Sequence, residues 1–137
     1  MTLDLRDPTQ PAEAVRTAMA LRPHPEGGHY REIWRDTPPD RSRGAASTIH
    51  FLLAAGERSA SHRVDAAEIW VWNAGSPLRL TIGTEIIILG PNLHTGETLQ
   101  AIVPAHIWQA AEALGPWTLV TCLVAPAFTF EGFELAP

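Results

Sequence analysis

Two side chains capable of acid–base chemistry, His62 and Glu68, lie in a segment that begins at Gly56 and ends at Gly75. Alternate residues of a strand face the same side, and a tight turn would return the glutamate, on the next strand, to the same cavity as the histidine. In an apolar interior the carboxylate favours the imidazolium, while burial opposes both charges. This arrangement is typical of a proton-abstracting site, although the pair could equally do no more than satisfy its own hydrogen bonds.

In the catalytic hypothesis, His62 is the base and Glu68 or Asp65 orients it. Tyr30 or His50 then gives a proton to the opposite face of the substrate. An aromatic residue, Trp70, shares strand parity with Glu68 and is expected to line the same cavity, where rigid aromatic side chains suit small-molecule ligands.

Short strands separated by turns must position these residues. The apolar pattern predicts one helix over residues 11–21, after which the apolar period falls to two. About eight strands are expected, and with turn signals every 8–12 residues they indicate an all-β sandwich or barrel. The segment 91–96 has the turn chemistry of a hairpin loop, and Cys122 is expected to be buried and inert. The expected strands cover residues 30–34, 48–53, 68–72, 78–82, 85–89, 99–103, 117–124 and 128–135.

Composition excludes several classes of function. The chain has 137 residues, enough for one domain, and carries a net charge of −5 with no lysine. Nucleic acid is not an expected partner, because its phosphates require a positive face, and Schiff-base catalysis needs a lysine. A single cysteine forms no internal disulfide, no apolar stretch approaches a membrane span, and the polar N-terminus is not a signal peptide. These observations predict a soluble, cytoplasmic protein that does not bind membranes.

The segment from Gly56 to Gly75 resembles the first motif of the cupin superfamily, G-x(5)-H-x-H-x(3,4)-E-x(6)-G. The spacing agrees at His62 and Glu68, but Val64 stands where the pattern has a second histidine. The second cupin motif is only partly present, since Gln109 replaces its ligand histidine and His106 replaces its glycine. Histidine tolerates the left-handed backbone better than most residues, so His106 is interpreted as a turn residue rather than a ligand.

A second signature, Pro23-His24-Pro25-Glu26-Gly27-Gly28, is similar to one in the cupin-5 branch, also called domain of unknown function 985. Further similarities occur in the same order as far as residue 135. The resemblance implies a single cupin domain over residues 1–137: a double-stranded β-helix, or jelly-roll barrel, preceded by a short helix. It also implies a solvent-accessible cavity and a homodimer. The signature itself is interpreted as a rigid turn.

The resemblance supplies no reaction, and three functions stay open. The first is a small-molecule-binding cupin that recognises a polar metabolite, a sugar or an organic acid, through residues that include Tyr30, His50, Trp70 and Gln109. The second is a metal-independent epimerase or isomerase. The third is a non-catalytic sensor or interaction module whose cavity is closed by tryptophans. No firm cofactor is expected: His62, Glu68 and Gln109 are the only candidates for a weakly bound divalent metal, and two good ligands with one amide fall short of a usual set.

Overall fold

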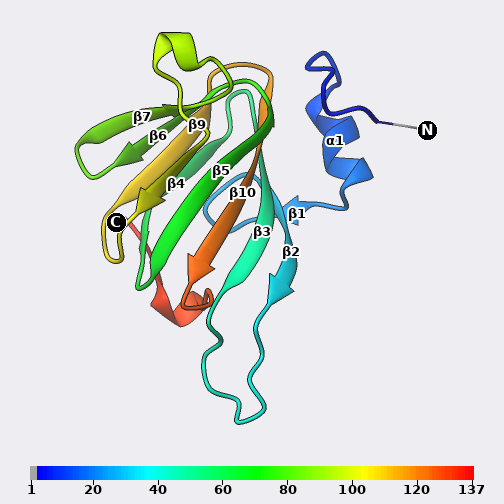
Figure 1. The fold of residues 1–137 in the computed structure, drawn as a ribbon. Helices are drawn as coiled ribbons and strands as arrows, with labels where there is room; N and C mark the ends of the chain where they lie inside the picture. The colour runs from blue at the N-terminus through cyan, green and yellow to red at the C-terminus, as the bar shows by residue number, and fades with distance from the viewer. Residues whose placement is uncertain (1–2) are drawn as a thin grey trace.

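The computed structural model describes residues 3–137, and it consists of two antiparallel sheets that face each other (Figure 1). The larger sheet has the strand order β1-β2-β3-β10-β5-β8 and the smaller one β11-β4-β9-β6-β7. Together they form a jelly-roll barrel, as the sequence predicts. The strands are β1 (Arg22–Pro23), β2 (His29–Arg35), β3 (Ser47–Ala54), β4 (Arg58–Val64), β5 (Ala67–Gly75), β6 (Leu78–Ile82), β7 (Glu85–Leu89), β8 (Gln100–Val103), β9 (Gln109–Ala113), β10 (Trp117–Ala125) and β11 (Phe133–Leu135).

The main core fills the space between the two sheets. Phe51, Trp70, Leu80 and Val120 are each no more than 1% exposed there. Alternation along β3 places Phe51 in this interior and Leu52 on the opposite face of the sheet. Both faces of this part of β3 are therefore covered, which agrees with its continuous apolar sequence.

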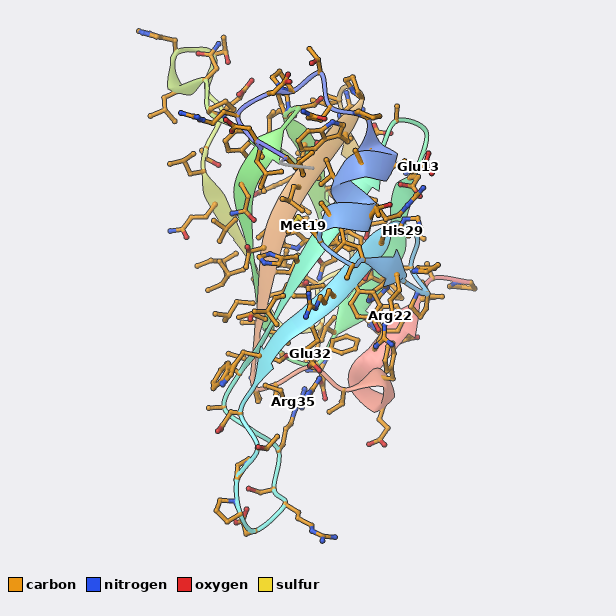
Figure 2. All side chains as sticks on the ribbon, turned by 90° about the vertical axis from the view of Figure 1, so that its right-hand side faces the viewer. Glu13, Met19, Arg22, His29, Glu32 and Arg35 are labelled. Atoms are coloured by element: carbon orange, nitrogen blue, oxygen red, sulfur yellow. The ribbon has the colours of Figure 1, made fainter. Side chains whose placement is uncertain are left out.

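Helix α1 (Ala12–Ala18) covers the outer face of the larger sheet near one end of the barrel (Figures 1 and 2). Its fully buried Val15 packs with Leu52, Trp117 and Leu119. The helix is shorter than the predicted 11–21, because Ala20 adopts a left-handed φ of 54° that ends the helical path. No helix among residues 3–137 is long and apolar enough to span a membrane.

The structure corrects the interpretation of residues 91–96. They contain a short 3₁₀ helix, η1 (Leu93–Thr95), and a left-handed Gly96, so the chain does turn there. The strands on either side, β7 and β8, nevertheless belong to different sheets. The segment therefore crosses from one sheet to the other and is not a hairpin loop. Turn residues report a change of direction but carry no information about which strands pair.

Candidate functional site

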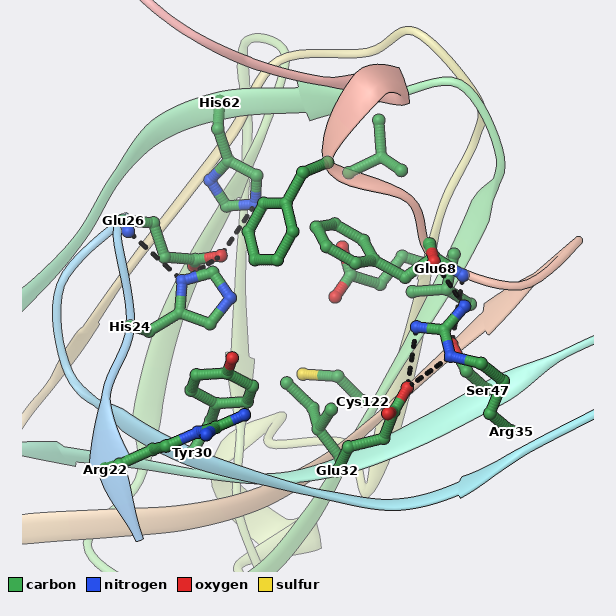
Figure 3. A pocket seen from close by; sticks show the side chains of 15 residues that line it. Arg22, His24, Glu26, Tyr30, Glu32, Arg35, Ser47, His62, Glu68 and Cys122 are labelled. Carbon is green, nitrogen blue, oxygen red and sulfur yellow. Dashed lines mark hydrogen bonds and ion pairs between the residues drawn. The ribbon is translucent and has the colours of Figure 1, made fainter.

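A cavity of about 160 Å³ opens between the sheets, near the 3₁₀ helix η2 (Phe130–Gly132) (Figure 3). Its interior polar wall includes His24, Glu26, Tyr30, His62 and Glu68, and its apolar wall includes Ile49, Val124, Phe128 and Phe130. An ion pair between Glu32 and Arg35 lines it as well. Exposed side chains at its edge, among them Arg22 and Phe130, connect the cavity to solvent. The interior is therefore accessible to a small molecule.

Strands β4 and β5 bring His62 and Glu68 to this cavity, where both side chains are buried. His62 Nδ1 lies 2.7 Å from the Ala60 carbonyl oxygen, which fixes the orientation of the ring. Glu68 Oε1 accepts a 2.9 Å hydrogen bond from Gln109 Nε2. In turn, Gln109 Oε1 accepts a 2.8 Å hydrogen bond from Trp70 Nε1. The histidine and the carboxylate thus share one interior, each held by a different partner.

Two further site residues, His24 and Glu26, were not predicted from the sequence. Glu26 Oε1 lies 3.5 Å from His24 Nδ1 and 3.6 Å from His62 Nε2, so this carboxyl group lies between two imidazoles. Ser59 Oγ donates a hydrogen bond to its other oxygen. The Glu26 side chain is only 9% exposed. The second acidic group of the cavity is therefore packed into a histidine cluster.

Backbone geometry explains how a surface turn delivers these two side chains. Gly27 and Gly28 have positive φ angles of 109° and 74°, which favour glycine. A Cβ atom at Gly27 would overlap the Arg58 carbonyl oxygen. The turn therefore packs directly against β4, and the Ala60 N–H donates a 2.8 Å hydrogen bond to the Glu26 carbonyl. The only sequence feature that could have indicated these two site residues is that a histidine and a glutamate lie in a turn made rigid by prolines and glycines.

Burial shifts the pKa values of the two carboxyl groups and two imidazoles just described, Glu26, Glu68, His24 and His62. Loss of hydration raises the pKa of Glu26 to about 8, and the nearby Glu68 carboxylate raises it further, against the hydrogen bond from Ser59. Burial also raises the pKa of Glu68 to about 7, against the hydrogen bonds from Gln109 and Cys122. Burial lowers the pKa of His24 to about 4 and holds that of His62 below its usual range. Near neutral pH the cavity therefore favours the neutral forms of Glu26 and the two histidines, whereas Glu68 is only partly protonated.

The other predicted site residues fall into different positions. Tyr30 lines the cavity, with its ring centroid 4.6 Å from that of His24. His50 does not line it, because it alternates with Ile49 and Phe51 and so lies on the outer face of the sheet. This placement corrects the expectation that His50 contacts the ligand or protonates it.

Trp70 and Gln109 lie behind the cavity wall rather than in it, since Trp70 is packed in the main core and donates to Gln109. Asp65 cannot orient His62, because it forms a 2.8 Å ion pair with Arg43 at the surface. His106 is exposed and adopts a left-handed φ of 70°, which confirms its interpretation as a turn residue. Cys122 is buried as predicted, and burial raises its pKa, but it also lines the cavity.

The residues present do not fit the divalent metal that cupins commonly hold. Both polar groups of the Gln109 amide are engaged, one by Glu68 and the other by Trp70. Val64 offers no donor at the position of the second motif histidine. No group of three or more His, Cys, Asp or Glu residues within the described chain is arranged to hold a metal ion. The donor set around His62 is therefore incomplete for a metal centre.

A jelly-roll barrel with a solvent-accessible polar cavity between its sheets is the architecture of cupin domains. The chain belongs to the cupin superfamily, in the family described as Cupin_5 (DUF985), whose model matches residues 13–136. No curated protein matches the sequence.

Solved structures agree with this assignment. A protein from Shewanella oneidensis is 37% identical, with a TM-score of 0.86 over 93% of this chain and 85% of its own. A hypothetical protein from Leishmania major is 28% identical, with a TM-score of 0.83 over 93% of this chain and 88% of its own. KdgF from a Halomonas species is 15% identical, with a TM-score of 0.63 over 81% of this chain and 89% of its own, and shows the common fold alone.

Proposed function

We propose that this protein binds a small polar metabolite, a sugar or an organic acid, in the barrel cavity. The observation that carries the proposal is the convergence of His24, Glu26, Tyr30, His62 and Glu68 on one interior that reaches solvent. Small-molecule sites typically combine an apolar wall with a few placed polar groups, and this cavity has both. Trp70 packs behind the cavity and does not fill it, which disfavours the sensor hypothesis in which tryptophans close the barrel.

The chemistry of the wall favours a hydroxylated ligand. Neutral carboxyl and imidazole groups donate and accept hydrogen bonds, as hydroxyl and carbonyl groups require. Phe128 and Phe130 supply an apolar surface, against which the C–H face of a sugar can pack. Two arginines line the cavity, and one of them, Arg35, is paired with Glu32 at 2.6 Å. The other, Arg22, lies at the edge with its Cζ 5.4 Å from the Tyr30 ring centroid, and is the cation that we expect to meet a ligand carboxylate.

Cavity size restricts the ligand further. A volume of about 160 Å³ is below the range of about 300–1,000 Å³ found for sites of drug-sized ligands. A nucleotide-linked sugar is therefore too large to be enclosed. The size instead favours a single sugar ring or a short-chain acid.

Calorimetric titration with monosaccharides, sugar acids, hydroxy acids and oxo acids tests the proposal. We expect at least one compound to bind the wild-type protein and to bind Tyr30→Phe and Glu68→Gln about tenfold more weakly, as expected for the loss of one hydrogen bond. Glu134→Gln is the matched control, because Glu134 pairs with Arg63 on the surface and does not line the cavity. Equal affinity in all four proteins would show that the ligand binds elsewhere.

Proton transfer is the second candidate function, and the epimerase or isomerase hypothesis is its concrete form. It is favoured by two separate carboxyl groups, Glu26 and Glu68, in the same cavity with pKa values raised close to neutrality. A general acid or base works best when its pKa lies near the working pH. Incubation of a bound compound in heavy water should then introduce deuterium at carbon. Unchanged mass for every compound that binds would contradict this function and leave the binding function intact.

A further inference from the structure

Hydrogen bonds to the backbone fix which nitrogen of each cavity histidine carries a hydrogen. The Glu26 backbone N–H donates to His24 Nδ1 at 3.1 Å, so Nδ1 is an acceptor and the ring hydrogen lies on Nε2. The Ala60 carbonyl is an acceptor only, so His62 Nδ1, 2.7 Å away, must be the donor. In the neutral ring His62 Nε2 then has a free lone pair. Both acceptor nitrogens, His24 Nδ1 and His62 Nε2, lie on the side of Glu26.

This arrangement determines the state of Glu26. Its Oε1 atom lies 3.5 Å from His24 Nδ1 and 3.6 Å from His62 Nε2, and neither nitrogen carries a hydrogen to donate in the neutral ring, so the arrangement disfavours a carboxylate and accommodates a carboxylic acid. Ser59 donates only to the other oxygen. Within the described chain no arginine pairs with Glu26. A buried acid without a cation retains its proton, in agreement with the raised pKa.

The second carboxyl group has the opposite environment. Glu68 Oε1 accepts a hydrogen bond from Gln109 Nε2, and Cys122 is a further hydrogen-bonding partner. Donors of this kind stabilise the carboxylate. An amide N–H donates to Glu68, whereas the two nitrogens that face Glu26 Oε1 carry no hydrogen, so Glu68 is the first of the two to ionise. Environments that separate two carboxyl groups in this way assign one as the acid and the other as the base.

We propose that Glu26 is the proton donor of this cavity, that the hydrogen-free nitrogens His24 Nδ1 and His62 Nε2 beside it favour its acid form, and that it acts on a ligand carbonyl oxygen, with Glu68 as the base. The inference rests on the proposed binding function and names its substrate class: small carbonyl compounds with a hydrogen on the adjacent carbon. These include 2-hydroxy aldehydes, 2-hydroxy ketones and 2-oxo acids.

The reaction balances without any other reactant. The Glu68 carboxylate takes the proton from the carbon next to the carbonyl group, and the C–H electron pair forms a C=C bond. The carbonyl π electrons move to oxygen, which receives the proton of Glu26. The resulting Glu26 carboxylate accepts the hydrogen bond from Ser59 and recovers its proton when the enol returns to the carbonyl form. Return of the proton from Glu68 to the same face of that carbon gives exchange. Where that carbon carries a hydroxyl group, delivery of the proton to the former carbonyl carbon gives isomerisation, and Glu26 then recovers its proton from that hydroxyl group.

Nuclear magnetic resonance of the ligand-free protein tests the proton assignment directly. In protein with ¹³C-labelled glutamate and ¹⁵N-labelled histidine, Glu26→Gln identifies the Glu26 carboxyl signal. We expect that signal to be in the protonated position at pH 6 and to change between pH 7 and 9, around a pKa of about 8. We also expect hydrogen on His62 Nδ1 and on His24 Nε2. An ionised Glu26 at pH 6, or hydrogen on neutral His62 Nε2, would overturn the inference even if ligands bind.

Deuterium exchange into carbonyl compounds tests the catalytic role. The wild-type protein should catalyse exchange at the carbon next to the carbonyl group. Glu26→Gln keeps the shape and a hydrogen-bond donor but has no acidic proton, and should lower the rate by at least about 100-fold. Glu68→Gln should lower it similarly, whereas Glu134→Gln, a surface change, should leave it unchanged.

The two experiments separate failure of the inference from failure of the proposed function. If no compound in the calorimetric panel binds, the proposed function fails, while the NMR titration still decides whether Glu26 holds the proton. If a carbonyl compound binds and exchanges as fast with Glu26→Gln as with wild type, the donor role of Glu26 is overturned and the binding function stands.

Discussion

Glu68 Oε1 accepts a 2.9 Å hydrogen bond from Gln109 Nε2, and the two side chains are 7% and 2% exposed. Gln109 lies on β9 and Glu68 on β5, so this bond joins the two sheets inside the barrel. Gln109 also accepts from Trp70. The amide of Gln109 thus provides the hydrogen-bond partner of both the buried Glu68 carboxyl group and the buried Trp70 indole N–H.

Gln109→Leu should destabilise the protein by about 1–3 kcal/mol, because it leaves a buried carboxyl group and a buried indole N–H without their partner. The pKa of Glu68 should also rise further, since the hydrogen bond from Gln109 lowers it. Urea unfolding measures the first effect and carboxyl NMR the second. Gln100→Leu is the control, because Gln100 is exposed on β8. Equal stability of the two variants would contradict the bridging role.

Stability should fall as the pH rises from about 6.5 to 8. Glu26 and Glu68 have folded-state pKa values of about 8 and 7, above the ordinary value of 4.5, so the folded protein binds more protons than the unfolded chain in this range. Each of these two carboxyl groups lowers the unfolding free energy by at most about 1.4 kcal/mol for each unit by which the pH rises.

His24 acts in the opposite direction between its lowered pKa of about 4 and its ordinary 6.5, so it offsets the carboxyl groups only below that range. Unfolding by urea at a series of pH values measures the slope. Glu26→Gln should make it shallower. A stability that increases between pH 6.5 and 8 would contradict the raised pKa values.

Gly27→Ala should destabilise the protein and weaken ligand binding together. The new Cβ atom would overlap the Arg58 carbonyl oxygen and displace the turn that carries His24 and Glu26. Gly96→Ala is a matched control, since Gly96 also has a positive φ, 88°, but no atom lies within 4 Å of its added Cβ. We expect the control to lose about 1 kcal/mol of unfolding free energy, because alanine disfavours a positive φ, and we expect Gly27→Ala to lose clearly more. Equal losses by thermal unfolding would show that close packing of the turn is unimportant.

The homodimer expected from the sequence stays a prediction. Edge strand β8 and the outer face of its sheet carry exposed apolar side chains, including Ile102 at 61% and Trp34 at 53% exposure. Exposed edges and apolar faces are commonly covered by association. Light scattering should give about 29.8 kDa, twice the 14.9 kDa of one chain. A mass of one chain at micromolar concentration would contradict the prediction.

The sequence predicted the parts of the fold that depend on local pattern. Alternating apolar residues predicted most of the strands, and motif spacing placed His62 and Glu68 in one interior. Strands β4 and β9 lie outside the expected strand ranges. The mostly polar sequence of β4, RSASHRV, gave no apolar alternation, and only the motif spacing implied a strand at His62. The sequence of β9, QAAEA, has low strand propensity and pairs with β4 and β6 only through the tertiary structure. Residue type alone could not show that His50 faces outward, since its face depends on the register of β3.

Glu26 and His24 could not be placed from the sequence for a related reason. A turn rich in proline and glycine is normally a surface feature, and its local pattern is the same whether its side chains face solvent or a barrel. The close approach of Gly27 to Arg58, a residue distant in the chain, turns these two side chains inward. Whether the cavity contains the Glu26 carboxyl group therefore depends on a contact between residues that are distant in the sequence.

Burial raises the pKa of Glu26 to about 8 and lowers that of His24 to about 4, so both of these cavity side chains are uncharged near neutral pH. A neutral ligand that binds beside such uncharged groups forms no charge–charge contact that salt could screen. Affinity for a neutral sugar should consequently be almost independent of ionic strength, whereas an acid held by Arg22 at the entrance should bind more weakly as salt is added.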